Sequence, residues 1–239
     1  MRFNLGLARS GTARATLVLA LVVLIHPLQA ATAQSPIVHP TVEKFLQSDQ
    51  PPLVSYRARR LLEASTRGGK MSASLEAWTE RDETGRFSFE VINSSGSAVI
   101  RQHVLMAALR EEQRIDNERA GHESAISRLN YMFDVTTEAD SLLRIDIKPH
   151  RASTFLVNGA IFVTPDAGDL IRVQGRLSKR PSFWTRSVEI TRRYERIHGV
   201  RVPVEMRSVA DVRLVGASTF SMTYVYETIN GERVSAATD

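Results

Sequence analysis

Side chains that could bind a metal ion are scattered along this chain. The histidines beyond residue 33 are His39, His103, His122, His150 and His198, and the chain contains no cysteine. None of them stands at metal-ligand spacing from another, and the zinc-binding pattern His-Glu-x-x-His does not occur. We therefore predict no metal site and no other cofactor. We expect a packing role for His103, which falls within a predicted helix.

Side chains that could act as nucleophiles also lack partners at a suitable spacing. The segment Gly121–Ser124 contains His122 and Glu123 beside a serine, but neighbours in sequence do not face one another as a catalytic triad requires. The patterns Gly-x-Ser-x-Gly and Ser-x-x-Lys do not occur, and Gly68–Lys70 lacks the other residues of a phosphate-binding loop. The pair Glu111-Glu112 is typical of the solvated end of a helix. The sequence therefore predicts no catalytic residue and no enzymatic activity.

Basic residues form clusters that could contact an anionic surface. One consists of Arg57, Arg59 and Arg60, and another surrounds Pro181–Trp184 and consists of Arg176, Lys179, Arg180 and Arg186. Because the second cluster mixes cations with aromatic rings, it suits an anionic headgroup, and our candidates for surface docking are Arg180, Trp184 and Arg186. The alternative, which we favour, is a solvated connection between strands with Trp184 packed on the core. Arg192, Arg193 and Arg196 are more simply strand residues with Glu189 and Glu195 as cross-strand partners.

The first 33 residues have the features of a secretory signal peptide. Arg2, Arg9 and Arg14 precede an apolar stretch from Ala15 to Ile25, and Ala31–Ala33 matches the small-x-small cleavage pattern. A membrane anchor is the alternative, but this stretch is well short of the roughly 20 residues that span a bilayer. We therefore predict an exported, soluble, periplasmic protein with no transmembrane segment after cleavage.

Charge and cysteine content exclude two further classes. The formal net charge is +5 at pH 7, and loss of three arginines with the signal peptide lowers it to +2. This balance gives no reason to expect a nucleic-acid partner. The absence of cysteine excludes a disulfide framework and a lipid attached to cysteine, so stability must come from a core.

The remainder of the chain is predicted to form one domain rich in β-strands. A polar lead-in arm, 34–52, contains a short candidate helix over Thr41–Gln47, the β domain spans 53–232, and 233–239 is a tail. Alternating apolar residues predict eight to ten antiparallel strands, with hairpin turns at Asp82–Gly85, Asn158-Gly159 and Thr164–Asp169.

One long helix interrupts the strands. Ala98–Arg114 contains no proline or glycine, follows cap residues at Ser94–Ser97, and places Ile100, Val104, Ala107 and Ala108 on one side with Leu105 and Leu109 beside them. The apolar face of such a helix must pack on the sheet. We therefore predict a mainly β (α+β) fold: a curved antiparallel sheet or half-barrel whose concave side the helix covers.

A curved sheet with a helix over it creates a cavity, and aromatic and methionine side chains recur on the predicted strands. In a closed sandwich these would be ordinary core. In a half-barrel they would line an apolar cavity able to hold an acyl chain. The candidate cavity residues are Phe87, Phe89, Ile100, Val104, Ala108, Tyr131, Phe133, Phe155, Phe162, Phe220, Met222 and Tyr224.

The stretch from Asn158 to Gly175, with an aromatic-bearing strand, an acidic glycine turn and a strand ending near Arg172-Val173, resembles a hairpin of the LolA/LolB-like outer-membrane lipoprotein-sorting superfamily. The segments Pro181–Trp184 and Arg192–Ile197 are more similar to an exported bacterial branch of it. The resemblance implies an incomplete β-barrel, helices over its open side and a hydrophobic cavity that binds lipid or acyl chains without catalysis. The missing cysteine contradicts the role of a lipid-anchored receptor.

Three functions follow as hypotheses. The first is a periplasmic protein that holds a lipid, an acyl chain or a lipoprotein moiety in an apolar cavity, with a role in outer-membrane lipoprotein sorting. The second is an interaction or regulatory module that docks an envelope protein and binds no ligand. The third is an exported hydrolase.

Overall fold

The computed structural model describes residues 39–47, 51–117, 124–139, 141–183, 185–213 and 216–235. The predicted signal peptide and the end of the tail lie outside these residues. The helical elements are α1 (Pro40–Gln47), α2 (Ala98–Ile100), the π-helical turn η1 (Arg101–Leu105) and α3 (Met106–Asn117). The strands are β1 (Tyr56–Thr66), β2 (Met71–Arg81), β3 (Phe87–Gly96), β4 (Tyr131–Ala139), β5 (Leu142–Pro149), β6 (Val157–Val163), β7 (Leu170–Leu177), β8 (Thr185–Ile197), β9 (Val200–Val212), β10 (Gly216–Ile229) and β11 (Glu232–Arg233).

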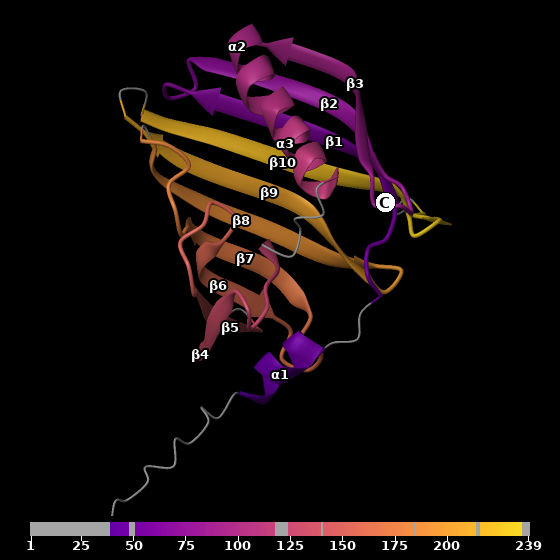
Figure 1. The fold of residues 1–239 in the computed structure, drawn as a ribbon, viewed down its shortest axis with the longest axis vertical. Coiled ribbons are helices and arrows are strands. Elements are labelled where there is room, and N and C mark those ends of the chain that lie inside the picture. The colour runs from indigo at the N-terminus through magenta and orange to yellow at the C-terminus, as the bar shows by residue number, and fades with distance from the viewer. Residues whose placement is uncertain are drawn as a thin grey trace, which may run out of the picture. The chain divides into compact units, whose positions relative to one another are not determined.

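All described strands belong to one curved, open antiparallel sheet (Figure 1). Its order is β3-β2-β1-β10-β9-β8-β7-β6-β5-β4, and the two-residue β11 pairs with β10. Most neighbours are consecutive hairpins, and β1 and β10 join the two ends of the chain. The predicted fold class is confirmed. Among the described residues, no helix is long and apolar enough to cross a membrane.

The sheet register places one row of side chains on the same face of eight strands. Reading across β2, β1, β10, β9, β8, β7, β6 and β5, the directly paired residues are Leu75, Leu62, Met222, Met206, Arg192, Val173, Ile161 and Ile145. Directly opposed residues of antiparallel strands project from the same face. This face therefore runs unbroken across the sheet, and it is the concave face, because the helices pack on it.

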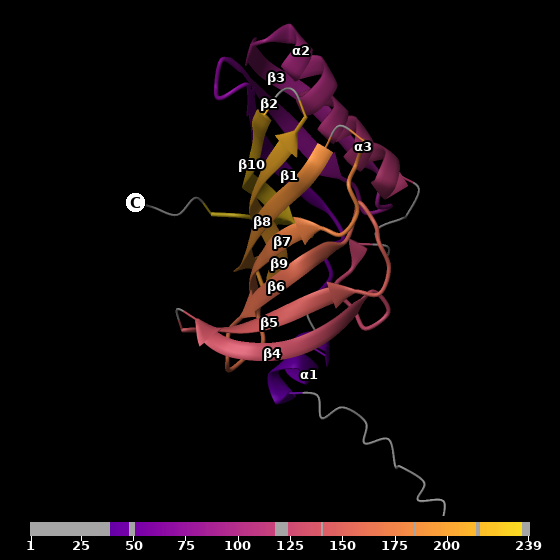
Figure 2. The same cartoon turned by 90° about the vertical axis from the view of Figure 1, so that its left-hand side faces the viewer.

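Two separate hydrophobic cores form on this face. In the first, Leu105 and Leu109 of the long helix pack against Leu62, Leu75 and their neighbours on β1, β2, β9 and β10. In the second, Val42 and Phe45 of α1 pack against residues of β4 to β7 such as Ile145 and Ile161. Figure 2 shows α2 and α3 along one end of the sheet and α1 at the other. The middle strand β8 lies between the strands that form the two cores.

The helix from Ala98 to Asn117 contains a π turn, which changes the face predicted for it. Ile100, Leu105 and Leu109 are buried, a spacing of five and then four residues. The extra residue of a π turn rotates the following positions about the axis. As a result Val104 is 39% exposed and Ala107 is exposed, against the prediction that both share the packed face. His103 is also exposed, so its predicted packing role is wrong.

The predicted helix cap is also wrong. Ser94 and Ser95 continue β3, where they pair with Leu75 and Ser74 of β2. Ser97 occupies the N-cap position, but its side chain makes no capping hydrogen bond. The Ser97 amide instead donates to the carbonyl of Ser72, at 2.8 Å. The β2–β3 ladder therefore directs the start of the helix.

Asn158 and Gly159 do not form a turn, although the pair is a strong hairpin signal. Both lie inside β6, and Gly159 pairs directly with Gly175 of β7. A Cβ atom on Gly159 would lie 2.2 Å from the carbonyl oxygen of Gln174 and 2.6 Å from the Cα of Gly175. The glycine is therefore required by the close approach of two backbones. The predicted turn at Thr164–Asp169 is confirmed, since the Thr164 amide donates to the Asp169 carbonyl at 2.9 Å.

Two substitutions distinguish the strand from the turn. We expect Gly159→Ala to lower the free energy of unfolding by about 1–3 kcal/mol, because two paired backbones must move apart. Asn158→Thr should change it by less than about 0.5 kcal/mol, since an exposed strand position accepts a β-branched residue. A type I′ turn needs positive φ at both positions, so there Asn158→Thr would be the costly change. Urea denaturation measures both.

Candidate functional site

A cleft of about 610 Å³ lies on the concave face, against the middle strands and the C-terminal half of α3. Its floor includes Met206, Arg192 and Val173, the central members of the row of paired residues. The volume falls within the usual 300–1,000 Å³ range of ligand pockets. The cleft therefore occupies the part of the concave face that lies between the two hydrophobic cores.

The lining is mostly apolar and aromatic. Helix α3 contributes Ala108 and Ile115, and the strands contribute Val173, Leu177, Val188, Ile190, Met206, Phe220 and Met222. Five phenol rings from β1, β4, β8 and β10 also line it, those of Tyr56, Tyr131, Tyr194, Tyr224 and Tyr226. Burial raises the pKa of Tyr224 and Tyr226. These phenols therefore stay neutral at physiological pH and add hydroxyl groups to an apolar surface.

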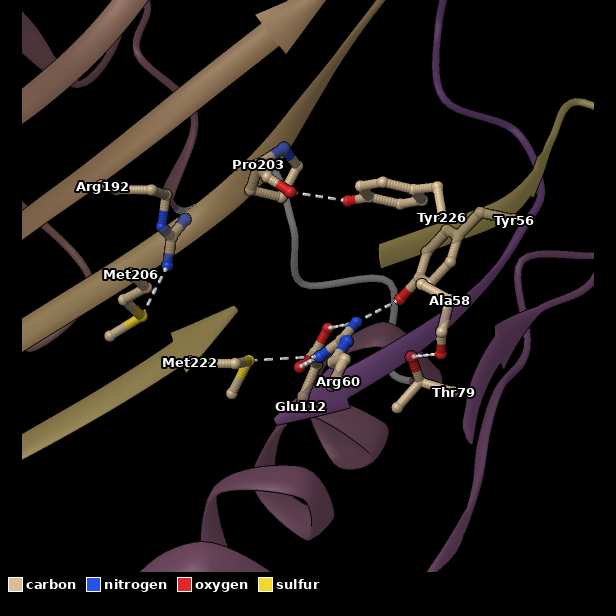
Figure 3. Close-up of polar contacts among 10 residues, drawn as sticks. All are labelled: Tyr56, Ala58, Arg60, Thr79, Glu112, Arg192, Pro203, Met206, Met222 and Tyr226. Atoms are coloured by element: carbon tan, nitrogen blue, oxygen red, sulfur yellow. Dashed lines mark hydrogen bonds and ion pairs between the residues drawn. The ribbon is translucent and has the colours of Figure 1, made fainter. Parts of the chain in front are cut away.

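A buried ion pair joins the cleft's helix to its sheet (Figure 3). Arg60 of β1 is only 1% exposed, and its two terminal nitrogens donate to the two oxygens of Glu112, at 2.5 Å for Nη1–Oε2 and 3.0 Å for Nη2–Oε1. Such a bidentate pair is both charge-assisted and geometrically specific. Glu112 lies one turn from the buried Leu109. The ion pair therefore ties the end of α3 to the middle of β1.

The remaining contacts of Arg60 come from the side chains around it. Nη2 also donates to the hydroxyl of Tyr56 at 2.5 Å, and the guanidinium carbon lies 4.5 Å from the ring centroid of Tyr224 and 5.3 Å from that of Phe87. Burial by itself lowers the pKa of Arg60, but the carboxylate of Glu112 together with Tyr224 and Tyr56 outweighs it, and the pKa is raised. Arg60 is therefore a charged group with its terminal nitrogens fully engaged.

A second arginine, Arg192 of β8, projects from the same face into the cleft. Its Nη2 donates only to the sulfur of Met206, at 3.5 Å, a weak acceptor. The Tyr194 side chain raises the pKa of Arg192 more than burial lowers it. Among the described residues no carboxylate forms an ion pair with Arg192, which distinguishes it from Arg60.

The lining offers little to catalysis or metal binding. It contains Ser124, Ser208 and Thr154, but among the described residues that line it there is no histidine, lysine or aspartate. Nor does the described part of the chain hold a group of three or more His, Cys, Asp or Glu residues able to bind a metal ion. The arrangement is suited to holding an apolar molecule rather than to activating a nucleophile.

The structure brings half of the predicted cavity residues together. Those that line the cleft are Ala108, Tyr131, Phe155, Phe220, Met222 and Tyr224. The others lie elsewhere: Phe87, Phe89 and Ile100 in the first core, Phe133 against the second, Val104 on the exposed side of the helix, and Phe162 buried on the opposite face of β6 beneath the guanidinium of Arg172. Ligand contact by the six lining residues stays a prediction.

Of the predicted docking residues, the structure describes Arg180 and Arg186. Arg180 is exposed, and Arg186 forms an exposed ion pair with Asp211 at 3.5 Å. Trp184 lies outside the described residues. The neighbouring Phe183 is exposed, with the Arg213 guanidinium 4.6 Å from its ring centroid. A docking role for these residues also stays a prediction.

Sequence reasoning missed the two arginines that matter most in the cleft. Proximity in sequence groups Arg60 with Arg57 and Arg59 as a basic cluster. In the strand, however, the side chain of Arg60 projects from the opposite face of β1. Arg192 was expected to pair with glutamates on the surface. A signal was available, since each arginine occupies a position of the apolar period, after Tyr56 and Ala58 in one strand and Val188 and Ile190 in the other.

Comparison with known proteins gives a distant structural similarity. No protein-family model matches the chain, and no curated protein matches it. Among solved structures, the chain is similar to the crystal structure of a LolA superfamily protein from Nitrosomonas europaea, with 9% sequence identity and a TM-score of 0.40 over 82% of this chain and 93% of that one.

The ion pair predicts unequal effects of two adjacent substitutions. Glu112→Gln should lower the free energy of unfolding by about 2–4 kcal/mol, because it leaves the buried charge of Arg60 without a counter-ion. Glu111→Gln should change it by less than about 0.5 kcal/mol, since Glu111 pairs with Arg114 in solvent. The double variant Arg60→Met/Glu112→Gln should be more stable than Glu112→Gln alone. Equal effects of the two glutamine substitutions would contradict a buried pair.

Proposed function

We propose that this protein is a non-enzymatic binding protein of the bacterial envelope that holds the acyl chain of a lipid in the cleft between α3 and strands β7 to β10. The observation that carries the proposal is the apolar cleft between two independent cores. Side chains whose only role is to form a core pack closely together, because protein interiors are close-packed, and they would leave no space of this size. An open apolar surface of this kind is typical of a ligand site.

The shape of the cleft favours a chain-like apolar group. Its floor follows the row of paired residues across β7 to β10, and α3 borders it with the small side chain of Ala108. Methionines at Met206 and Met222 add unbranched, adaptable side chains to this surface. Such a lining suits flexible methylene chains that need no fixed pattern of hydrogen bonds.

The location and the physiological role extend the proposal. The signal-peptide pattern of residues 1–33 supports export to the periplasm, where a protein that shields acyl chains from water can move lipid between membranes. Outer-membrane lipoprotein sorting, expected from the family resemblance, is one such role. The bound moiety would then be the acyl chains of a lipoprotein.

The other two functions have weaker support. Docking of an envelope protein would use the exposed Phe183 and its neighbours, where the guanidinium of Arg213 already lies over the Phe183 ring. A hydrolase would need a base beside a nucleophile, and none of the described lining residues provides that combination. Lipid binding is therefore the function that the geometry favours.

The direct test is to purify the protein from a periplasm, extract it with organic solvent and identify co-purified lipids by mass spectrometry. A near-stoichiometric lipid with at least one acyl chain is expected. Recovery of the protein without lipid, together with no binding of a neutral apolar fluorescent probe, would refute the proposal.

Two adjacent alanines on α3 provide a matched pair for blocking the cleft. Ala108→Phe places a ring into the space beside the sheet, and we expect it to weaken binding of a neutral probe such as N-phenyl-1-naphthylamine about tenfold or more. Ala107→Phe adds the same ring on the exposed side of the helix and should leave the affinity unchanged. Fluorescence titration measures both, with circular dichroism to verify folding. Equal weakening by both variants would place the probe outside the cleft.

A further inference from the structure

We infer that the ligand of this cleft carries one anionic group, which Arg192 binds through its guanidinium, so that the preferred ligand is a free fatty acid rather than a neutral lipid. This inference rests on the proposed function and adds a requirement for charge to it. The evidence is the position of Arg192 on the floor of the cleft and the lack of an ion pair between Arg192 and any carboxylate of the described residues.

Arg192 occupies a position that an apolar residue would normally fill. It lies in the row of paired residues between Val173 and Met206, on the floor of the cleft and between the two cores. A charged side chain placed there loses hydration and needs a partner. The described contacts are with the sulfur of Met206 and the phenol of Tyr194. The carboxylate of Glu112, which Arg60 holds in a bidentate pair, is the smallest of the influences that raise the pKa of Arg192.

A guanidinium has five N–H donors in a planar fork. The contacts with Met206 and Tyr194 do not use all five N–H groups of Arg192. The remaining N–H groups can donate to a ligand in the cleft, which Arg192 lines. A carboxylate matches the fork with two oxygens. An ester or alcohol headgroup offers neither the charge nor two equivalent acceptors.

The other charged side chains of the lining do not replace this partner. Arg60 is already held by both oxygens of Glu112 and by Tyr56. Glu111 is exposed and pairs with Arg114. Of the two glutamates of the lining, one is therefore engaged by Arg60 and the other by Arg114.

The arrangement also orients the ligand. The carboxylate would lie at Arg192, on β8, while the chain extends over the apolar residues on either side, such as Val188 and Met222. Because the hydroxyls of Tyr194 and Tyr224 also line this part of the cleft, they can donate further hydrogen bonds to the headgroup.

The test compares dodecanoic acid with methyl dodecanoate, which share a chain but differ in charge, as competitors of the neutral probe at pH 7.5. The wild-type protein should bind the acid about tenfold to a hundredfold more tightly than the ester. Arg192→Met should bind both alike, with the ester affinity unchanged. Arg193→Met is the matched control, because Arg193 lies on the other face, is exposed and pairs with Glu205 at 3.4 Å. It should keep the preference for the acid.

A pH titration of the wild-type protein gives a second measurement that requires no variant. The preference for the acid should disappear below about pH 4, where the carboxylate is protonated, while the ester affinity stays constant. Equal binding of acid and ester at pH 7.5, or a preference that survives in Arg192→Met, would overturn the inference but leave lipid binding intact. Failure of the probe, the acid and the ester alike to bind would instead refute the proposed function.

Discussion

The concave face of the sheet is longer than the helices that cover it, and this mismatch governs the rest of the structure. The row of paired residues from Leu75 to Ile145 crosses eight strands, yet the long helix covers only the β1–β3 end with β9 and β10, and α1 only the β4–β7 end. Apolar surface left uncovered is unfavourable by about 25 cal/mol per Å². Met206 is partly buried against the first core, Arg192 belongs to neither core, and both line the cleft. A ligand there would complete what the helices leave open.

The ion pair of Arg60 and Glu112 determines where the covered surface ends. A helix could bury its leucines on this face in several registers, because hydrophobic contact has little directionality. The bidentate contact has a defined geometry, and a shift of α3 along the sheet would leave a buried charge unpaired at a cost of several kcal/mol. The pair therefore determines where the helix packs on the sheet more than how strongly the helix is held there. Since Glu112 also lines the cleft, the docking of α3 and the outline of the cleft depend on the same contact.

Alternation of apolar residues was sufficient to predict the strands, the hairpins at 82–85 and 164–169, and the single long helix, because these depend on local pattern. The errors arose where a long-range contact overrides the local signal. Asn158-Gly159 is a turn signal by composition, but Gly159 is needed for its approach to Gly175, which lies in another strand. The π turn at Arg101–Leu105 likewise has no sequence signature, and it moved Val104 out of the packed face. Half of the proposed cavity residues were found, since alternation identifies a face but not which part of that face a helix covers.

The two arginines show why charge within an apolar period is more informative than charge in a cluster. A cluster counts residues near one another in sequence, and in a strand half of these project to each face. Arg57 and Arg59 accordingly form exposed ion pairs, whereas Arg60 between β1 and α3 is buried. A charged residue in the apolar period must lose its hydration, so it persists only where another group compensates. For Arg60 that group is Glu112, within the protein. For Arg192 no carboxylate of the described residues forms an ion pair, since Glu112 is engaged by Arg60, and a ligand would supply the compensating charge.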